Sequence, residues 1–505
     1  MPPAPVRWPT IVVVGAGIAG LAAAWEAADA GAEVVLLDAD RRAGGKLAST
    51  MLLGRRIDTG ADAFLARRPE ATTFVRDVGL GGSLVSPATS SALLWNRGQL
   101  QRLPEGLLLG LPTDLVALAR SRVLSPLGLG RAALDLVLPG NPVPSEVDVA
   151  VGHLVRRRLG AEVHDRLVDP LLGGINAGDS DGLSLQAGVP QLAAALQGHR
   201  SLLVAAWRGR RRQRRAQAVP PTGARSRWQQ RADTLPLVSS VTASLGRWRQ
   251  PEAEPSPVFS SVSGGLGRFA DQVTRMLGER GVRVVLGFTA ERLDQRNGRW
   301  SVVTGTGARF AADAVVLAVP PGPAAALLEP HAPTSAARLG GIASASVAMV
   351  CLAYRADEVG RSLDGSGFLV PRRERRLMTA CSWASSKWPE VAAPGTVVLR
   401  VSAGRAGDPR ALALGNDVLV AKLHREVAAA LAITGEPTAH HVTRWVDAFP
   451  QYAPGHAELV AAVEHGLPAG LEVAGAAYRG VGVPACIGSG RAAAIRALAG
   501  ARITP

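Results

Sequence analysis

Residues 11–38 read IVVVGAGIAGLAAAWEAADAGAEVVLLD, and this stretch decides the fold of the chain. An apolar run leads into a glycine-rich turn, an alanine-rich segment and a second apolar run that ends on an acid. This is the order of strand, turn, helix and strand in a dinucleotide-binding unit. In that unit Gly15 permits the tight turn, Gly17 lets the backbone approach a pyrophosphate, and Gly20 lets the helix pack on the strand.

The pyrophosphate is expected at the start of this helix, where free backbone N–H groups and the helix dipole favour negative charge. The carboxylate of Asp38 is expected to hold a ribose hydroxyl. A glycine motif alone is a weak signal, and a strand–helix turn without a ligand is the alternative; the flanking strand, helix and acid favour binding. The dinucleotide-binding residues predicted here are Gly15, Ala16, Gly17, Ile18, Ala19, Gly20, Asp38 and Ala39.

A second glycine motif follows the second strand, because residues 44–46 read Gly-Gly-Lys. It resembles the double-glycine motif of flavoproteins in the amine oxidase and porphyrinogen oxidase superfamily; an ordinary polar turn is the alternative. The resemblance implies FAD, bound without a covalent bond, with Gly45 and Lys46 closing over its phosphates. It also implies that the following turn passes close to the flavin through Gly60, Ala61, Asp62 and Ala63.

Composition indicates a globular protein with two or three domains, since the chain has 505 residues, 47% of them hydrophobic and 19% charged. The net charge is +15, and nearly all of the basic residues are arginines; the lysines are Lys46, Lys387 and Lys422. Two explanations stay open. Arginine pairs with carboxylates in a bidentate way, which suits a polycarboxylate ligand, and a GC-rich genome gives the same excess. No nucleic-acid-binding motif is present, so no such partner is predicted.

The cysteines indicate a reduced, cytoplasmic protein, because Cys351, Cys381 and Cys486 are odd in number, far apart and without metal-binding spacing. We therefore predict no metal site. No signal peptide is evident. No apolar run reaches the ~20 residues of a membrane helix; the nearest, residues 339–354, is interpreted as a buried strand.

Residues 87–257 are predicted to form a helical substrate domain, because amphipathic segments alternate with proline breaks. Two interpretations stay open: a substrate domain alone, or one that also touches the inner face of a membrane. The arginine-rich run at 208–231 is expected to be a flexible basic insertion without a catalytic role. Upstream, Arg67 and Arg68 form either a solvated turn or a contact to a substrate carboxylate near the flavin.

Residues 147–192 carry the most telling resemblance. The stretch contains RRRLG and, further on, DPLLGGINAGD, and it closely resembles the helical segment of bacterial coproporphyrinogen III and protoporphyrinogen oxidases, whose pattern is RRRLG and EPLLSGIYAGD. Asn176 stands where tyrosine is common in that family. If the position packs on the substrate macrocycle, this departure alters the fit of the substrate.

The same family resemblance continues to the end of the chain. Residues 377–405 match its strands, Ala290 stands where a valine touches the adenine end of FAD, and RWVDAFPQYAPGH places Trp445 against FAD. The final strand, turn and helix imply that Val481, Gly482 and Val483 line the flavin ring, with the start of the helix, near residue 484 or 485, facing it. Cys486 as a covalent flavin attachment is the less favoured alternative.

The predicted fold class is α/β, α+β overall, with a discontinuous Rossmann-type FAD domain of the amine-oxidase and porphyrinogen-oxidase kind. Its three parts are residues 1–86, 258–335 and 441–505, with the helical segment 87–257 and a β-rich substrate segment 336–440 inserted.

The family resemblance implies an oxidase of haem biosynthesis that converts coproporphyrinogen III to coproporphyrin III. Flavin N5 accepts hydride, oxygen reoxidises the flavin with release of hydrogen peroxide, and no catalytic side chain is assigned. A coproporphyrin ferrochelatase is the implied consumer of the product. Protoporphyrinogen IX is the alternative substrate, and an amine oxidase or carotenoid desaturase is a more distant alternative. A non-enzymatic scaffold that binds anionic partners through residues 208–231 is the remaining hypothesis.

Overall fold

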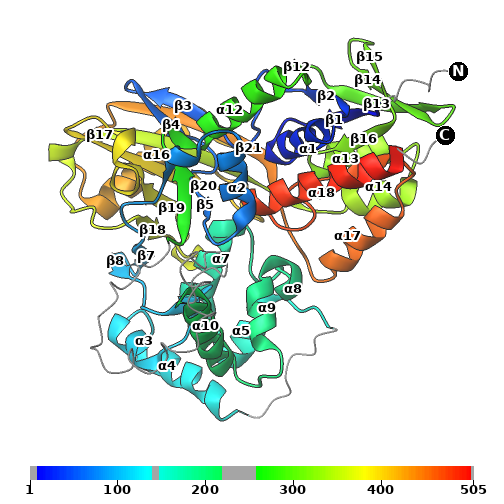
Figure 1. Ribbon diagram of the computed structural model, residues 1–505. Coiled ribbons are helices and arrows are strands. Elements are labelled where there is room, and N and C mark those ends of the chain that lie inside the picture. Colours follow the sequence, from blue (N-terminus) through cyan, green and yellow to red (C-terminus); the bar gives the residue numbers. More distant parts are fainter. Residues whose placement is uncertain (1–7, 139–146, 219–256, 502–505) are drawn as a thin grey trace, which may run out of the picture.

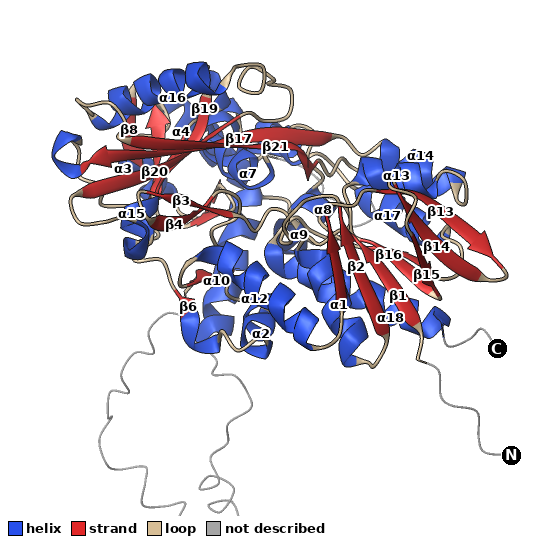
Figure 2. Cartoon of the chain, turned by 90° about the horizontal axis from the view of Figure 1, so that it is seen from above, coloured by secondary structure: helices blue, strands red, loops and turns tan. Residues whose placement is uncertain are grey.

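The computed structural model describes residues 8–138, 147–218 and 257–501, and these form three regions (Figure 1). A five-stranded parallel sheet with its helices and a seven-stranded sheet lie at opposite ends of the molecule, as the view from above shows (Figure 2). A helical region packs below both in Figure 1. The α/β fold class is confirmed: the parallel sheet is built from three separate stretches of the chain, and the helical region and the seven-stranded sheet are inserted between them.

The parallel sheet has the strand order β12–β2–β1–β16–β22, and every neighbouring pair is parallel. Its strands are β1 (Thr10–Val14), β2 (Glu33–Asp38), β12 (Arg283–Leu286), β16 (Ala314–Leu317) and β22 (Leu471–Val473). One face carries α1 (Ile18–Asp29), α2 (Pro69–Asp77), α12 (Gly265–Glu279) and α18 (Val483–Ala501). The other face carries α13 (Pro321–Leu328), α14 (Pro333–Gly340), α17 (His456–His465) and an antiparallel sheet of β13 (Ala290–Arg296), β14 (Arg299–Thr304) and β15 (Arg309–Ala312).

The central strand β1 is buried on both faces, which explains its unbroken apolar sequence. Ile11 and Val13 pack into the core under α1 and α18, while Val12 and Val14 pack into the core of the opposite face. The carboxyl ends of β1 and β2 therefore emerge between two filled cores, where the glycine turn after Val14 is held firmly.

The seven-stranded sheet has the order β21–β17–β20–β19–β18–β7–β8. Its strands are β7 (Ala92–Asn96), β8 (Gln99–Arg102), β17 (Ser344–Arg355), β18 (Gly367–Leu369), β19 (Met378–Trp383), β20 (Thr396–Ala403) and β21 (Ala439–Pro450). Helix α16 (Asn416–Leu431) covers one face: Ala348, Val350 and Leu352 of β17 point into the core beneath it. The alternate residues Val347 and Met349 line a cavity on the other face.

Three expectations from the sequence are corrected here. The segment from residue 87 is not helical throughout, because β7 and β8 extend the large sheet and β7 pairs in parallel with β18. The β-rich segment 336–440 contains the helix α16. The apolar run 339–354 is a strand only from Ser344, since its first residues end α14. Pairing with the distant strand β18 accounts for the first difference, whereas α16 and the end of α14 are local helical structure.

The helical region forms one core from short helices. They are α3 (Leu115–Ser121), α4 (Pro126–Ala133), α5 (Val151–Leu159), α6 (Ala161–Val163), the π-helix η3 (His164–Val168), α7 (Asp169–Asn176), α8 (Leu185–Gly188), α9 (Pro190–Leu196) and α10 (Leu202–Ala218). Helix α10 corrects the prediction of a flexible insertion, because residues 208–218 continue a helix that is anchored by buried Leu202 and Ala206. The rest of that arginine-rich run lies outside the described residues.

The remaining elements are short. They are β3 (Ser49–Leu52), β4 (Arg55–Asp58), β5 (Phe64–Leu65), β6 (Leu84–Val85), β9 (Leu107–Leu108), β10 (Leu111–Pro112), β11 (Phe259–Val262), α15 (Ala384–Lys387) and the 3₁₀ turns η1 (Gly81–Ser83), η2 (Leu134–Leu136), η4 (Ala356–Glu358), η5 (Arg372–Glu374) and η6 (Pro389–Val391). In the part of the chain that the structure describes, no helix combines the length and the apolar character needed to cross a bilayer.

Candidate functional site

One large cavity of about 1910 Å³ lies where the three regions meet. Sites for a single small ligand usually enclose about 300–1,000 Å³, so this cavity has room for a cofactor and a second ligand. Its lining runs from the glycine turn after β1, past β17 and β21, to helix α7. The sequence therefore folds into one continuous chamber that joins the nucleotide-binding end to the helical end.

Most of the residues singled out from the sequence line this cavity. They are Gly15, Gly17, Ile18, Ala19, Asp38, Ala39, Gly45, Lys46, Gly60, Ala61, Asp62, Ala63, Arg67, Arg68, Asn176, Ala290, Trp445, Val481, Gly482 and Val483. Ala16 and Gly20 do not line it. Ala16 is buried and donates its N–H to Asp38, and Gly20 packs against the turn itself.

The three glycines of the turn differ in what surrounds them. Gly15 has a φ of +104°, and a Cβ there would lie 2.6 Å from the carbonyl oxygen of Ala318. A Cβ on Gly20 would lie 1.7 Å from the carbonyl oxygen of Gly15, so a side chain would separate helix from strand. A Cβ on Gly17, by contrast, meets no protein atom within 4 Å and would enter the cavity. This open space at the start of α1 fits a pyrophosphate.

Asp38 stands at the end of β2 and braces the turn from the cavity side. One carboxylate oxygen accepts the Ala16 N–H at 2.5 Å and the other accepts the Asp40 N–H at 2.8 Å. Burial raises the pKa of Asp38, and the two backbone hydrogen bonds oppose that shift. Each carboxylate oxygen has a further lone pair that can accept from a ribose hydroxyl, so the two roles are compatible.

Lys46 and Cys486 both line the cavity and interact electrostatically. The Lys46 ammonium donates to the Ala448 carbonyl and lies 5.5 Å from the centre of the Phe449 ring, which joins the second glycine motif to β21. Burial lowers the pKa of Lys46. Burial also raises the pKa of Cys486 to about 11, so its thiol stays protonated although it lies at the start of α18. A protonated thiol is a poor nucleophile, which favours FAD held without a covalent bond.

The sequence reasoning missed a buried ion cluster around Asp62, here called the Asp62 cluster: Asp62, Lys387 and Arg400. The same carboxylate oxygen of Asp62 lies 2.6 Å from Arg400 Nη1 and 2.9 Å from Lys387 Nζ. Trp388 Nε1 donates to this oxygen at 3.2 Å. Burial acts to raise the pKa of Asp62, but Arg400 and Lys387 hold it well below its usual range.

All three members of the Asp62 cluster line the cavity. Lys387 lies 325 residues beyond Asp62 in the chain, and Arg400 lies 340 residues beyond Gly60, to which it donates a hydrogen bond. No local spacing reveals such a cluster. The available signal was the family-like string of residues 377–405, which contains both cations.

The far wall of the cavity is apolar and comes largely from α7, with Leu171, Leu172 and Ile175, faced by Leu108 and Phe368. The mainly apolar lining suits a large, flat, hydrophobic ligand.

Asn176 ends this helix. Its side-chain amide donates to the Leu172 carbonyl at 3.1 Å, and its backbone carbonyl accepts from Gln451 Nε2 at 3.0 Å. Asn176 is thus turned back on its helix, although it borders the cavity.

Arg67 and Arg68 lie at the mouth of the cavity, and both are exposed. Arg68 is engaged: its guanidinium contacts the Glu70 carboxylate at 2.8 Å through Nη2 and at 3.2 Å through Nε. Arg67 makes no ion pair with any residue that the structure describes. The pair therefore offers one tethered and one untethered cation for an acidic ligand.

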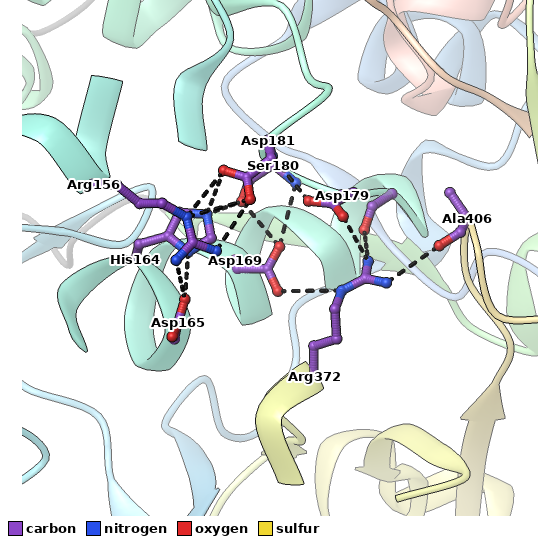
Figure 3. Close-up of polar contacts among 10 residues, drawn as sticks. Arg156, His164, Asp165, Asp169, Asp179, Ser180, Asp181, Arg372 and Ala406 are labelled. Atoms are coloured by element: carbon purple, nitrogen blue, oxygen red, sulfur yellow. Dashed lines mark hydrogen bonds and ion pairs between the residues drawn. The ribbon is translucent and has the colours of Figure 1, made fainter. Parts of the chain in front are cut away.

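A second charged cluster joins the start of α7, at Asp169, to the turn that follows this helix (Figure 3). This Arg372 cluster comprises Arg156, His164, Asp165, Asp169, Asp179, Ser180, Asp181 and Arg372, and no member lines the cavity. Arg372 of η5 donates to the Gly178 carbonyl at 3.0 Å and to the Ala406 carbonyl at 3.3 Å. It thereby ties the turn after α7 to the loop after β20.

Comparison with known proteins gives one consistent result. The family described as flavin containing amine oxidoreductase matches residues 18–498. The chain is 31% identical to the coproporphyrinogen III oxidase of Bacillus subtilis, over 97% of both chains. It is 34% identical to that of Mycobacterium leprae, over 95% of this chain and 96% of the relative. A candidate protoporphyrinogen oxidase from Exiguobacterium sp. 255-15 has a similar structure, with a TM-score of 0.79, 29% identity and coverage of 98% and 99%.

Proposed function

The chain belongs to the flavin containing amine oxidoreductase family, and from its similarity to coproporphyrinogen III oxidases we propose that it oxidises coproporphyrinogen III to coproporphyrin III. It is a FAD-dependent oxidoreductase. The observation that carries the choice of substrate is the similarity to coproporphyrinogen III oxidases over 95% or more of the chain. The cavity of about 1910 Å³, which joins the dinucleotide turn to an apolar wall, has room for FAD and a macrocycle. The reaction belongs to haem biosynthesis, and a coproporphyrin ferrochelatase stays a predicted consumer of the product.

The residues that hold FAD in this proposal follow the cavity from one end to the other. The open space at Gly17 takes the pyrophosphate, Asp38 takes the ribose, and Trp445 and Val481 border the flavin end. FAD supplies the hydride-accepting centre, and oxygen takes up the electrons and leaves as hydrogen peroxide. The protein adds the start of α18 at Val483, whose free N–H groups favour negative charge next to the cavity.

The proposed reaction needs little acid–base catalysis by protein side chains. A porphyrinogen carries pyrrole nitrogens that push electron density toward the bridge carbon losing hydride, so positioning dominates the catalysis. The apolar wall of α7 and Phe368 excludes water and holds the macrocycle, while Arg67 at the mouth meets its carboxylates. The chain's tyrosines do not form an aromatic cage, since Tyr354, Tyr452 and Tyr478 do not line the cavity, which weighs against an amine substrate.

Growth of porphyrin fluorescence in air tests this function. Purified protein is given coproporphyrinogen III or protoporphyrinogen IX separately, with spontaneous oxidation subtracted and peroxide measured. We expect faster turnover of coproporphyrinogen III with release of peroxide. Preference for protoporphyrinogen IX would transfer the proposal to the alternative substrate, and a yellow protein that turns over neither would refute the porphyrinogen assignment.

We also propose that the helical region contacts an anionic membrane surface. An exposed apolar group gathers there on the neighbouring elements α3, α4, η2 and α10: Val116, Leu127, Leu134, Leu136, Val137 and Trp207. The exposed arginines Arg120, Arg122, Arg208 and Arg211 belong to the same helices or their ends. Apolar and basic side chains together favour an anionic lipid surface.

Sedimentation with vesicles tests this contact. The chain should sediment with vesicles of phosphatidylglycerol but not with those of phosphatidylcholine alone, and the double variant Leu127→Glu, Val137→Glu should stay in the supernatant. Equal sedimentation of the wild-type protein and the double variant would contradict the proposed membrane contact.

A further inference from the structure

We propose that Lys387, fixed in the cavity wall by its ion pair with Asp62, supplies a positive charge that favours the two-electron reduction of bound FAD. The proposal rests on the FAD site and not on the identity of the substrate, so it survives a change of substrate.

The Asp62 cluster contains two cations and one anion, and all three face the same cavity. The Lys387 side chain is 17% exposed, Asp62 is 19% exposed and Arg400 is 5% exposed. At such sites charges are screened far less than at the surface. One positive charge therefore remains after Asp62 has been paired, and it is held beside the cofactor space.

The geometry identifies Lys387 as the member that presents this charge. Arg400 is turned to other partners through both terminal nitrogens, with Nη1 on Asp62 and Nη2 donating to the Gly60 carbonyl, and its buried Nε has no hydrogen-bond partner among the described residues. Lys387 has three N–H donors, and in the described part of the chain Asp62 is the acceptor that it contacts. Two donors of Lys387 thus make no hydrogen bond to the described residues; the ammonium also lies 5.5 Å from the centre of the Trp388 ring, and Lys387 lines the cavity.

The nearest further charge does not cancel the effect. Asp58 faces Arg400, but its carboxylate accepts from the hydroxyl of Ser49 at 2.7 Å and from the N–H groups of Leu266 and Gly267 at 2.8 and 3.1 Å. These N–H groups belong to the first turn of α12, whose dipole compensates the charge of Asp58. Cys351, also near Arg400, is neutral because burial raises its pKa to about 11.

The cavity places this charge within the flavin section of the site. Gly60 lies against Lys46, since a Cβ on Gly60 would be 1.9 Å from the Lys46 carbonyl oxygen and 3.2 Å from the Trp445 ring. Arg400 donates a hydrogen bond to the Gly60 carbonyl, and Asp62 lies two residues after Gly60 in the chain. The Asp62 cluster thus borders the stretch that runs from the second glycine motif to Trp445.

Reduction changes the charge of the cofactor, and this is where Lys387 acts. Two electrons and one proton, taken from a hydride donor or from a chemical reductant, add one negative charge to FAD. A fixed cation in a poorly screened site stabilises that added charge without having to reorganise. Loss of the cation should therefore make FAD harder to reduce.

The test measures the FAD reduction potential of the purified holoenzyme by anaerobic titration with dithionite against a reference dye, without any porphyrinogen. Lys387→Met should lower the equilibrium constant for reduction at least tenfold, which is about 30 mV for a two-electron couple. Lys387→Arg should keep the wild-type value because it keeps the charge. Lys422→Met is the matched control, since Lys422 is exposed on α16.

A second variant gives a shift of opposite sign. Asp62→Asn removes the anion and should make reduction more favourable. A wild-type potential in FAD-loaded Lys387→Met, or an equal shift in Lys422→Met, would overturn the proposal. If Lys387→Met does not accumulate as folded protein, Lys387→Gln takes its place with the same expected shift and the same outcomes.

Discussion

Two charged clusters flank the cavity, and they differ in whether their side chains reach it. The Asp62 cluster lines the cavity with all three of its members, whereas the Arg372 cluster holds the start of α7 and the turn after it and lines none of the cavity. Both are partly or fully buried and both join segments distant in sequence. The difference teaches that a buried ion network close to a site can either present charge to a ligand or position the wall that holds it.

The largest effect should come from a variant that cannot bind FAD, since the two clusters are compared by their position around the FAD cavity. Gly17→Val should abolish FAD binding, so that the purified variant is colourless and inactive. The φ of Gly17 is −66° and no protein atom lies within 4 Å of the added Cβ, so the fold accepts the side chain while the pyrophosphate space does not. Absorbance at 450 nm and circular dichroism measure the two consequences separately.

Gly278→Val is the matched control for that variant. Gly278 is exposed near the end of α12, and a Cβ there also meets nothing within 4 Å. It should stay yellow and active. A yellow Gly17→Val protein would contradict the assignment of this turn to the pyrophosphate.

The second prediction concerns the stability that the Asp62 cluster contributes. Asp62→Asn leaves Arg400 and Lys387 without their carboxylate, and loss of one partner of a buried pair costs about 3 kcal/mol of unfolding free energy. The pKa of Asp62 is depressed in the folded protein. The contribution is therefore fully present above the unfolded pKa of about 4 and is lost as the pH falls through the lower folded pKa.

Urea unfolding at pH 7 and at pH 3 measures this difference, which should shrink at the lower pH. Asp364→Asn is the control, because the ion pair between Arg102 and Asp364 is exposed and such pairs contribute about 0–1 kcal/mol. Equal losses for both variants would show that the Asp62 cluster is no more than a surface pair.

The third prediction addresses the Arg372 cluster. Arg372→Ala removes the bonds to the Gly178 and Ala406 carbonyls, so the turn after α7 is no longer tied to the large sheet. We expect KM for the porphyrinogen to rise about tenfold, or ~1.4 kcal/mol, with FAD content and reduction potential unchanged. Steady-state kinetics and the FAD titration check both statements.

Arg373→Ala is the control, since Arg373 is exposed and adjacent. Arg372→Lys should restore only part of the KM, because a lysine lacks the planar fork that reaches both carbonyls. A fall in FAD content in Arg372→Ala would erase the distinction between the two clusters.

The dinucleotide end was largely predictable, because its requirements are local. The turn after the buried strand requires a positive φ at Gly15 and close packing at Gly20. Both requirements are met by glycines within one short stretch of sequence, so the motif is recognisable from the sequence. The start of α18 at Val483, one residue before the expected start, followed from the same kind of pattern.

The inserted regions were less predictable, because their structure depends on distant pairing. Residues 92–96 form β7 only through the parallel partner β18, far along the chain. The two cations of the Asp62 cluster come from α15 and β20, so no spacing connects them with Asp62. Arg67 and Arg68, the arginines proposed for the substrate, line the cavity, and their role stays a prediction. The ion pair with Glu70 that holds Arg68 but not Arg67 was not visible in the sequence.

The smallest expected effect lies outside both clusters, at the mouth of the cavity, and it tests whether charge matters there at all. Arg68 must leave Glu70 to reach a substrate carboxylate, whereas Arg67 makes no ion pair in the described residues. Arg67→Ala should therefore raise KM for coproporphyrinogen III about threefold, in the range of an exposed ion pair, and should affect the two-carboxylate protoporphyrinogen IX less. Arg68→Ala should have the smaller effect on either substrate. Added salt should reduce the Arg67 effect, since exposed charges are screened within about 10 Å at 0.1 M; equal, salt-independent effects of both variants would mean that the substrate carboxylates are bound elsewhere.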